Sequence, residues 1–133
     1  MHKKSDRSKC SEYGLLPPGH LEDNREWRCW FAVNAHAYHG MKLTTRMLAE
    51  INHSEAGRIS REAEVYGKDI REAAKRAMVE SPVVKLLNGT YIPHIPTRAG
   101  LRGRDLGWFR EGAYGPLHLV ECDIIKPGEE MAT

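Results

Sequence analysis

The 133-residue sequence has few cysteines, only three, and they lie far apart at Cys10, Cys29 and Cys122. An odd number of widely spaced cysteines argues against a disulfide framework, and the lack of a C-x-x-C pair argues against a zinc knuckle. We therefore expect three reduced thiols with no special chemistry.

The sequence also lacks the long apolar run that a signal peptide or a membrane span needs. Its first stretch, MHKKSDRSKCSE, is basic and polar. This predicts a cytoplasmic protein with no membrane partner. The composition, 41% hydrophobic and 29% charged, is ordinary for a soluble chain of one domain. We place a flexible basic tail at 1–20, a single domain at 21–126 and a polar tail at 127–133.

A strong charge of one sign is missing as well. The net charge is only +2 and the pI is about 8.5. This mild basic bias permits nucleic-acid binding without requiring it, so the positions of the charges must decide.

The spacing of large side chains predicts helices in the first half of the chain. Those from Trp27 to Tyr38 recur at three- and four-residue steps, which favours one helix over about 22–39 that ends at Gly40. A hydroxyl residue followed by an apolar stripe predicts a second, short helix over 44–52.

The dipeptide Asn88-Gly89 is the clearest local signal in the sequence. Two apolar, β-prone runs flank it, and it accepts the backbone angles of a two-residue hairpin turn. We expect strands at about 82–87 and 90–95. An irregular loop should follow at 97–115, where five glycines and four arginines occur, and then a strand in LHLVECDII, residues 117–125.

The stretch ISREAEVYGKDIREAAKRAM, residues 59–78, is either one helix or two. A continuous helix would carry Val65, Tyr66 and Gly67 in its middle, at a cost of roughly 2 kcal/mol relative to alanine. We therefore predict a break near Tyr66, which makes a helix-turn-helix.

This region resembles a known family. Residues 61–78, REAEVYGKDIREAAKRAM, are similar to the second and recognition helices of helix-turn-helix regulators, and 63–70 follow their pattern Ala-Gly-Val-Ser-x-x-x-Val. The following segment resembles the recognition helix and wing of GntR-type winged-helix repressors, with the wing ending at 89–92 as Gly-Thr-Tyr-Ile. The resemblance covers about 44–95. It implies an α+β fold, a winged helix-turn-helix with an N-terminal aromatic helix and a C-terminal strand.

Two features depart from the family pattern. Glu64 replaces the usual turn glycine, and acids such as Asp69 and Glu72 lie on the helix that should face phosphates. These acids favour an alternative in which the charges pair along the helix at four-residue steps.

The resemblance implies binding of double-stranded DNA, with specificity from base edges and affinity from phosphates. Lys68 and Arg71 are the base-edge candidates, because they lie in the first exposed turn of the expected recognition helix. The phosphate candidates are Arg61, Lys75, Arg76 and Lys85, and the wing residues are Asn88, Gly89, Thr90 and Tyr91.

The arginine-rich loop allows two interpretations. Four arginines among glycines, with Trp108 and Phe109 beside them, form either a basic arm that tracks nucleic acid or, for the aromatics, part of the core. The arginines are Arg98, Arg102, Arg104 and Arg110.

Catalytic and metal chemistry finds little support. His36 and His39, with Cys29 upstream, have ligand-like spacing, but no second cluster completes a zinc site. Glu121 and Asp123 form a carboxylate pair of a kind common by chance. We therefore expect no enzyme activity, no metal and no cofactor.

The sequence thus predicts a small transcriptional repressor that binds duplex DNA. Repressors of this shape dimerise, and the aromatic helix with Trp27, Trp30, Phe31 and Tyr38 is the natural seam, although the domain's own core explains these residues equally well. The alternative is a protein-binding inhibitor or adaptor of mobile-element type that uses its winged helix to block a host complex.

Overall fold

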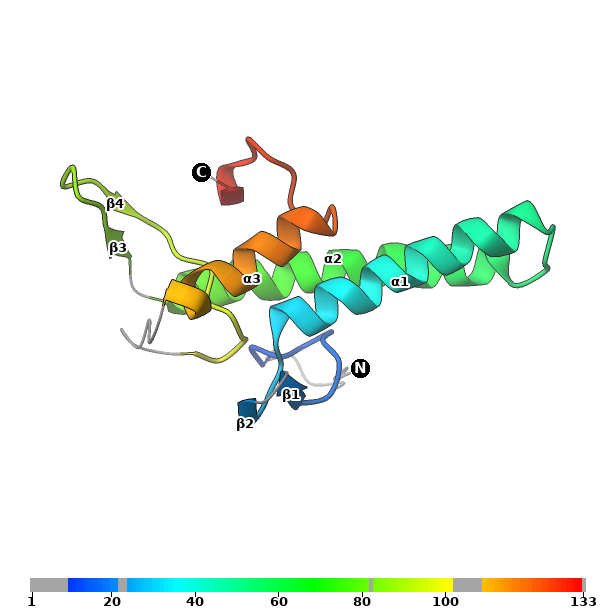
Figure 1. Cartoon of the computed structure of the whole chain (residues 1–133), viewed down its shortest axis with the longest axis horizontal. Coiled ribbons are helices and arrows are strands. Elements are labelled where there is room, and N and C mark those ends of the chain that lie inside the picture. The colour runs from blue at the N-terminus through cyan, green and yellow to red at the C-terminus, as the bar shows by residue number, and fades with distance from the viewer. Residues whose placement is uncertain (1–9, 22–23, 82, 102–108, 133) are drawn as a thin grey trace.

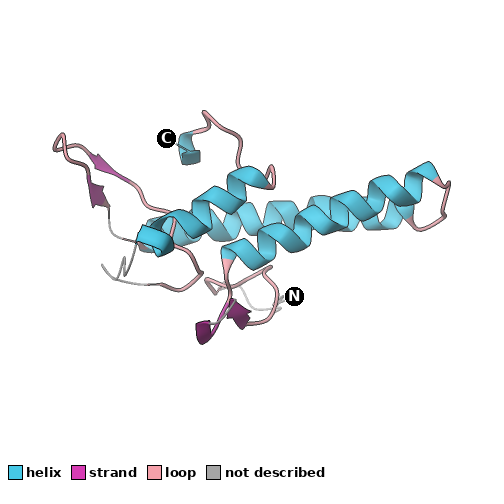
Figure 2. Ribbon diagram, viewed as in Figure 1, coloured by secondary structure: helices cyan, strands magenta, loops and turns pink. Residues whose placement is uncertain are grey.

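The computed structural model describes residues 10–21, 24–81, 83–101 and 109–132. Within these residues, three α-helices and two small antiparallel hairpins form a mixed fold (Figures 1 and 2). The predicted α+β class is confirmed. The elements are β1 (Gly19–Leu21), β2 (Asn24–Arg28), α1 (Phe31–Glu50), α2 (Ala56–Glu80), β3 (Val84–Lys85), β4 (Tyr91–Ile92), α3 (Phe109–Glu121) and the short 3-10 helix η1 (Glu130–Ala132).

The two helices expected at 22–39 and 44–52 are one helix, α1. It begins at Phe31 because the residues before it form β2, and it continues through Gly40. Thr44 does not cap a new helix: its hydroxyl donates to the carbonyl of Gly40 at 2.9 Å, a bond within the helix. A glycine inside a helix costs about 1 kcal/mol relative to alanine. The other residues of α1 offset this cost.

The end of α1 is set by Asn52, which adopts a positive φ of 54°. The next amide, of His53, donates to the carbonyl of Leu48 at 2.8 Å, and Asn52 donates to Ala49 at 3.0 Å. This bond pair satisfies carbonyls of the last helical turn and reverses the chain into α2. The two helices then pack antiparallel (Figure 1).

The predicted break near Tyr66 is wrong, because α2 is continuous over 25 residues. Tyr66 is a core residue, buried with its hydroxyl bonded to Asn34 of α1. Gly67 is a packing site: a Cβ there would lie 2.7 Å from Cε2 of Tyr38. Close approach of α1 to α2 and burial of Tyr66 together outweigh the poor helix propensity of this segment.

The expected C-terminal strand at 117–125 is wrong as well. Residues 117–121 are the end of α3 and 122–125 form the turn that follows it, and Leu119 and Cys122 are both buried. The helix also includes 109–115, which we expected to be loop. At Gly115 a Cβ would lie 2.7 Å from the carbonyl oxygen of Pro96, so this glycine allows α3 to contact the chain before it.

Both expected tails take part in the fold where the structure describes them. Leu15 is fully buried, so the folded region begins before residue 20. At the other end, Glu129 pairs with Arg71 of α2 and Met131 packs against the core. Residues 1–9 lie outside the described part of the chain.

The predicted hairpin is confirmed, with shorter strands, but the expected two-residue turn at Asn88-Gly89 is wrong. β3 and β4 pair antiparallel, with Val84 opposite Ile92 and Lys85 opposite Tyr91. The amide of Gly89 donates to the carbonyl of Leu86 at 3.0 Å, and Gly89 has a φ of 86°. The turn therefore runs over 86–89 with the glycine alone in the positive-φ position. We call residues 84–92 the wing.

Candidate functional site

The two predicted base-edge residues lie in different environments on α2. Lys68 is exposed, but Arg71 turns inward toward the C-terminal segment. Its guanidinium donates to the carbonyl of Ile124 at 2.9 Å and forms an ion pair with Glu129. Arg71 therefore fastens the C-terminal segment to α2, whereas no such contact engages the exposed Lys68 among the interactions of the described residues.

Of the predicted phosphate contacts, two make contacts within the protein and two are exposed. Arg76 donates to the carbonyl of Tyr13 at 2.9 Å, and Lys75 pairs with Glu72 at 3.3 Å. Arg61 and Lys85 are exposed, and Lys85 lies 5.8 Å from the ring centroid of Tyr91. The exposed charged side chains of α2 balance, four basic and four acidic: Arg58, Arg61, Lys68, Lys75, Glu62, Glu64, Glu72 and Glu80.

The wing is exposed at its tip, and its own side chains stabilise the turn. Oδ1 of Asn88 accepts a hydrogen bond from the amide of Thr90 at 3.0 Å. The turn thus uses Asn88 locally, while Leu87 beside it is fully exposed.

Among the four arginines of the arginine-rich loop, the structure describes the side chain of Arg98. Its side chain is only 12% exposed, pairs with Glu26 and lies 5.2 Å from the ring centroid of Trp30. Arg98 therefore fastens the loop to the N-terminal hairpin. Arg102, Arg104 and Trp108 lie outside the described residues, and Arg110 falls in the first turn of α3, where the side chains are not described.

The expected aromatic dimer seam is largely internal. Trp30 and Phe31 are buried, and Nε1 of Trp30 donates to the carbonyl of Gly19 at 2.9 Å. Trp27 is exposed, but it lies on β2 and contacts His20 edge-on. Of the two explanations that the sequence left open, burial in the domain's own core applies to Trp30 and Phe31.

The far end of the α1–α2 pair forms a projecting arm, which we define as residues 42–62 (Figure 1). None of these residues is buried. Leu43, Met47 and Ile51 follow one another at four-residue steps and are 44%, 67% and 70% exposed. They form an apolar stripe along one face of α1 that the described part of the chain does not cover.

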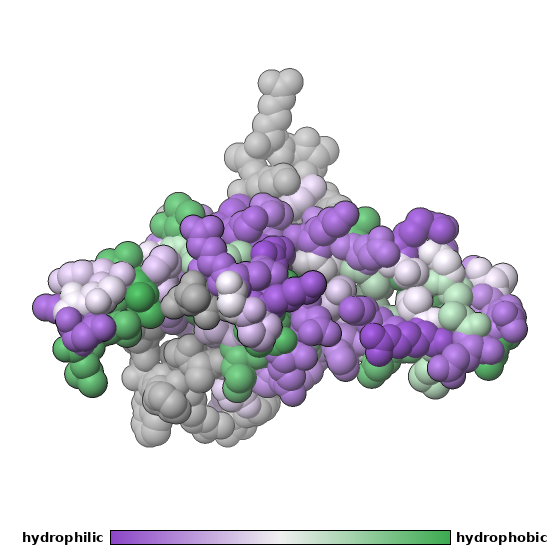
Figure 3. All heavy atoms as spheres, turned by 90° about the horizontal axis from the view of Figure 1, so that it is seen from above, coloured by the Kyte–Doolittle hydropathy of each residue, from purple (hydrophilic) through white to green (hydrophobic). Residues whose placement is uncertain are grey.

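A second set of exposed apolar side chains lies at the opposite end of the molecule. Figure 3 shows apolar atoms at the surface near both ends of the long axis. This second set follows the C-terminus of α2 into the wing and comprises Val79, Val83, Leu86, Leu87 and Tyr91.

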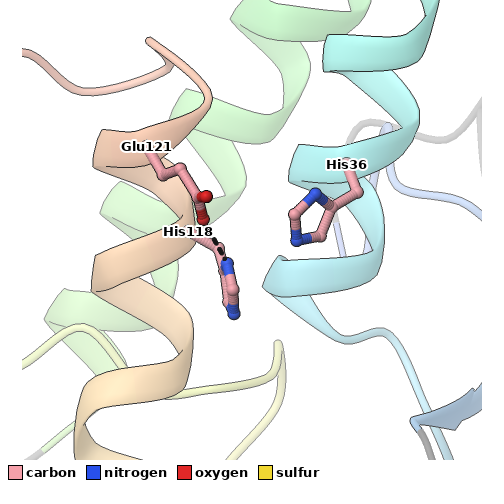
Figure 4. A group of neighbouring side chains, drawn as sticks. All are labelled: His36, His118 and Glu121. Carbon is pink, nitrogen blue, oxygen red and sulfur yellow. Dashed lines mark hydrogen bonds and ion pairs between the residues drawn. The ribbon is translucent and has the colours of Figure 1, made fainter.

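A cluster of side chains that the sequence did not reveal lies between α1 and α3 (Figure 4). His36 of α1 faces His118 and Glu121 of α3, and one ligand atom from each lies within 4.8 Å of the others. Nδ1 of His118 lies 2.8 Å from Oε2 of Glu121, and the two imidazole centroids are 4.7 Å apart. The signal in the sequence was the three-residue step from His118 to Glu121, which only a helix places on one face.

Burial raises the pKa of two of the three cysteines, Cys29 and Cys122. Burial, with Glu12 nearby, raises the pKa of Cys29 to about 11, and its Sγ donates to the carbonyl of Leu16. Burial also raises the pKa of Cys122. Both are free cysteines, as is the exposed Cys10.

The chain matches no protein-family model, no curated protein and no solved structure. Among the described residues, none of the helices combines the length and the apolar character needed to cross a bilayer.

Proposed function

We propose that this protein is a non-catalytic protein-binding module whose arm docks on a second copy of the chain. The observation that carries this proposal is the stripe of Leu43, Met47 and Ile51 on an arm with no buried residue. The proposal follows the adaptor alternative of the sequence analysis and moves the dimer seam from the aromatic segment to the arm.

The physical reason is that two helices alone share one seam and leave their outer apolar faces in water. Full burial of a leucine, isoleucine or methionine side chain contributes about 1.5–3 kcal/mol, and the stripe holds one of each. A third or fourth helix that packs on the stripe buries these side chains and so gains this free energy. Monomeric helix pairs otherwise carry polar residues at such positions.

The stripe is self-complementary, which favours a second copy as its occupant. In an antiparallel arrangement centred on Met47, Leu43 of one copy meets Ile51 of the other and the two Met47 side chains meet on the axis. Arg46 of one copy then comes near Glu50 of the other, so the flanking charges attract. The product is a twofold four-helix bundle of two arms.

Pairing through the arms leaves the wing ends free. Each copy would carry the second apolar set, from Val79 to Tyr91, at the end away from the bundle. Such a dimer has two equivalent surfaces for a further protein, which is the arrangement that an adaptor needs.

The test is sedimentation velocity of the full chain over a concentration series, for the wild type, Met47→Glu and the control Ala49→Glu. Ala49 is exposed on the opposite side of α1 from Met47, so its glutamate leaves the stripe intact. We expect wild type and Ala49→Glu to dimerise and Met47→Glu to remain monomeric. A monomeric wild type at high micromolar concentration, or a dimeric Met47→Glu, overturns the proposal.

Duplex DNA is a second candidate, favoured by one observation. Arg61, Lys68 and Lys75 are exposed and seven residues apart, so they lie along one face of α2. In this candidate the chain is a small regulator that places the continuous helix α2 against the duplex, with the wing beside it. Fluorescence anisotropy with a labelled duplex tests it: affinity must fall steeply with salt, and Lys68→Ala must cost about 1–3 kcal/mol. No duplex affinity at low salt removes this candidate.

A further inference from the structure

We infer that His36, His118 and Glu121, between α1 and α3, form a site for one divalent transition-metal ion, such as Zn²⁺. Two imidazoles and one carboxylate are a donor set that zinc accepts with a fourth position open to water. The site lies away from the arm, and it is independent of the proposed dimer.

The first support is convergence from separate elements. His118 and Glu121 are three residues apart on α3, and such a pair alone is an ordinary surface ion pair. His36 comes from α1, 82 residues earlier in the chain, yet its imidazole faces the same point (Figure 4). Packing of α1 on α3 therefore assembles the third ligand.

The second support is that neighbouring groups orient the two imidazoles. Sγ of Cys122 lies 3.9 Å from Nδ1 of His36, which leaves the other ring nitrogen of His36 free for a ligand. Tyr114 contacts the ring of His118 edge-on, with centroids 5.0 Å apart. Such neighbours fix ring orientation, as outer groups do around metal-bound histidines.

The distances suit an ion after small side-chain rotations. Ligand atoms about 2.0–2.2 Å from a tetrahedral zinc lie roughly 3.3–3.5 Å from one another. The present ligand atoms lie within 4.8 Å of one another, so closure requires movements of roughly an ångström. Between His118 and Glu121 the ion takes the place of the hydrogen on Nδ1, and that proton moves to Nε2 of the same ring.

Exposure of the site is compatible with entry of an ion. His36 and Glu121 are exposed, whereas the His118 side chain is only 18% exposed. His118 is thus held firmly while the other two can adjust. Because the ion joins α1 to α3, its binding should stabilise the fold.

The test is isothermal titration of ZnCl₂ into the full, untagged chain carrying Cys10→Ser, which removes the exposed thiol. We expect one zinc per chain, with affinity reduced at least about ten-fold in His36→Ala, His118→Ala and Glu121→Gln. His39→Ala, on α1, and His53→Ala, in the turn between α1 and α2, are controls outside the cluster and should change affinity less than two-fold. Zinc should raise the melting temperature of the control chains and leave that of His118→Ala unchanged.

Three results would overturn the inference. They are the absence of zinc binding by the Cys10→Ser chain, a loss in the control variants as large as in the cluster variants, and unchanged binding in all three cluster variants. A second readout uses Co²⁺, whose visible absorption reports its donors. Absorption bands typical of Co²⁺ bound by imidazole and carboxylate support the assignment. A cobalt–thiolate absorption band that Cys122→Ser abolishes overturns this donor set.

Discussion

The hydroxyl of Tyr66 on α2 donates a hydrogen bond to Oδ1 of Asn34 on α1 at 2.6 Å, and both side chains are only 1% exposed. The same Oδ1 accepts the amide of Leu16 at 2.8 Å, and Nδ2 of Asn34 donates to the carbonyl of Trp30 at 2.6 Å. One buried amide thus holds α1, α2 and the N-terminal segment in a single register.

Removal of the Tyr66 hydroxyl should destabilise the fold. Tyr66→Phe keeps the ring but takes one partner from a buried oxygen, at a cost of about 1 kcal/mol. Urea denaturation measures the change. Tyr91→Phe is the control. Because Tyr91 is exposed on the wing, this substitution should change the free energy of unfolding by no more than about 0.5 kcal/mol. Equal stabilities of wild type and Tyr66→Phe would contradict the role assigned to this bond.

Gly67 should respond to alanine in the opposite way from an ordinary helical glycine. Gly40 of α1 has nothing within 4 Å of an added Cβ, so Gly40→Ala should stabilise by up to about 1 kcal/mol. At Gly67 the added Cβ meets the ring of Tyr38 at 2.7 Å, so Gly67→Ala should be neutral or destabilising.

A double-mutant cycle isolates the cause. In a Tyr38→Ala background the obstructing ring is absent, and Gly67→Ala should then stabilise the protein as Gly40→Ala does. The same response of Gly67→Ala in both backgrounds would show that Tyr38 is not the neighbour that requires glycine.

Gly40 and Gly67 also show why helix ends were harder to predict from the sequence than the hairpin. Gly40 and Gly67 each suggested the end of a helix, yet both lie inside one, because a glycine permits a break without requiring it and packing decides. The hairpin at Asn88-Gly89 was predictable because its turn chemistry is local.

The candidate metal cluster was harder to predict for a related reason. Residues 117–125 alternate in a way that fits a strand, and in a strand His118 and Glu121 point to opposite faces. Their helical three-residue step was an equally valid reading of a short apolar segment. The approach of His36 depends on how α1 packs against α3, which no local pattern contains.

The three cysteines should react with alkylating reagents at very different rates. Cys10 is exposed, whereas Cys29 and Cys122 are buried with raised pKa values, so little thiolate is present at either at pH 8. Mass spectrometry after brief iodoacetamide treatment should show one label on the folded chain and three after denaturation. Cys10→Ser should abolish the fast label. A fast second label would mean that a buried thiol is more accessible than this fold allows.

The ion pair between Arg71 and Glu129 should make stability depend on acid pH. A hydrogen bond from Arg71 lowers the pKa of Glu129 below its ordinary value of 4.5 in the folded chain. A carboxyl with a depressed folded pKa contributes stability that is fully present above the unfolded pKa and lost as pH falls through the folded value. Glu129→Gln removes this contribution, so the variant should be less stable than wild type at pH 7 and closer to it at low pH.

Urea midpoints of wild type and Glu129→Gln at pH 7 and at pH 3 measure this convergence. Glu64→Gln is the control, an exposed carboxyl on α2 whose substitution should leave the wild-type pH dependence intact. The second bond of Arg71, to the carbonyl of Ile124, persists in Glu129→Gln, so the C-terminal segment stays attached while the charge is removed. A constant difference between wild type and Glu129→Gln at both pH values would show that the carboxylate charge contributes nothing and that Arg71 holds the segment through Ile124 alone.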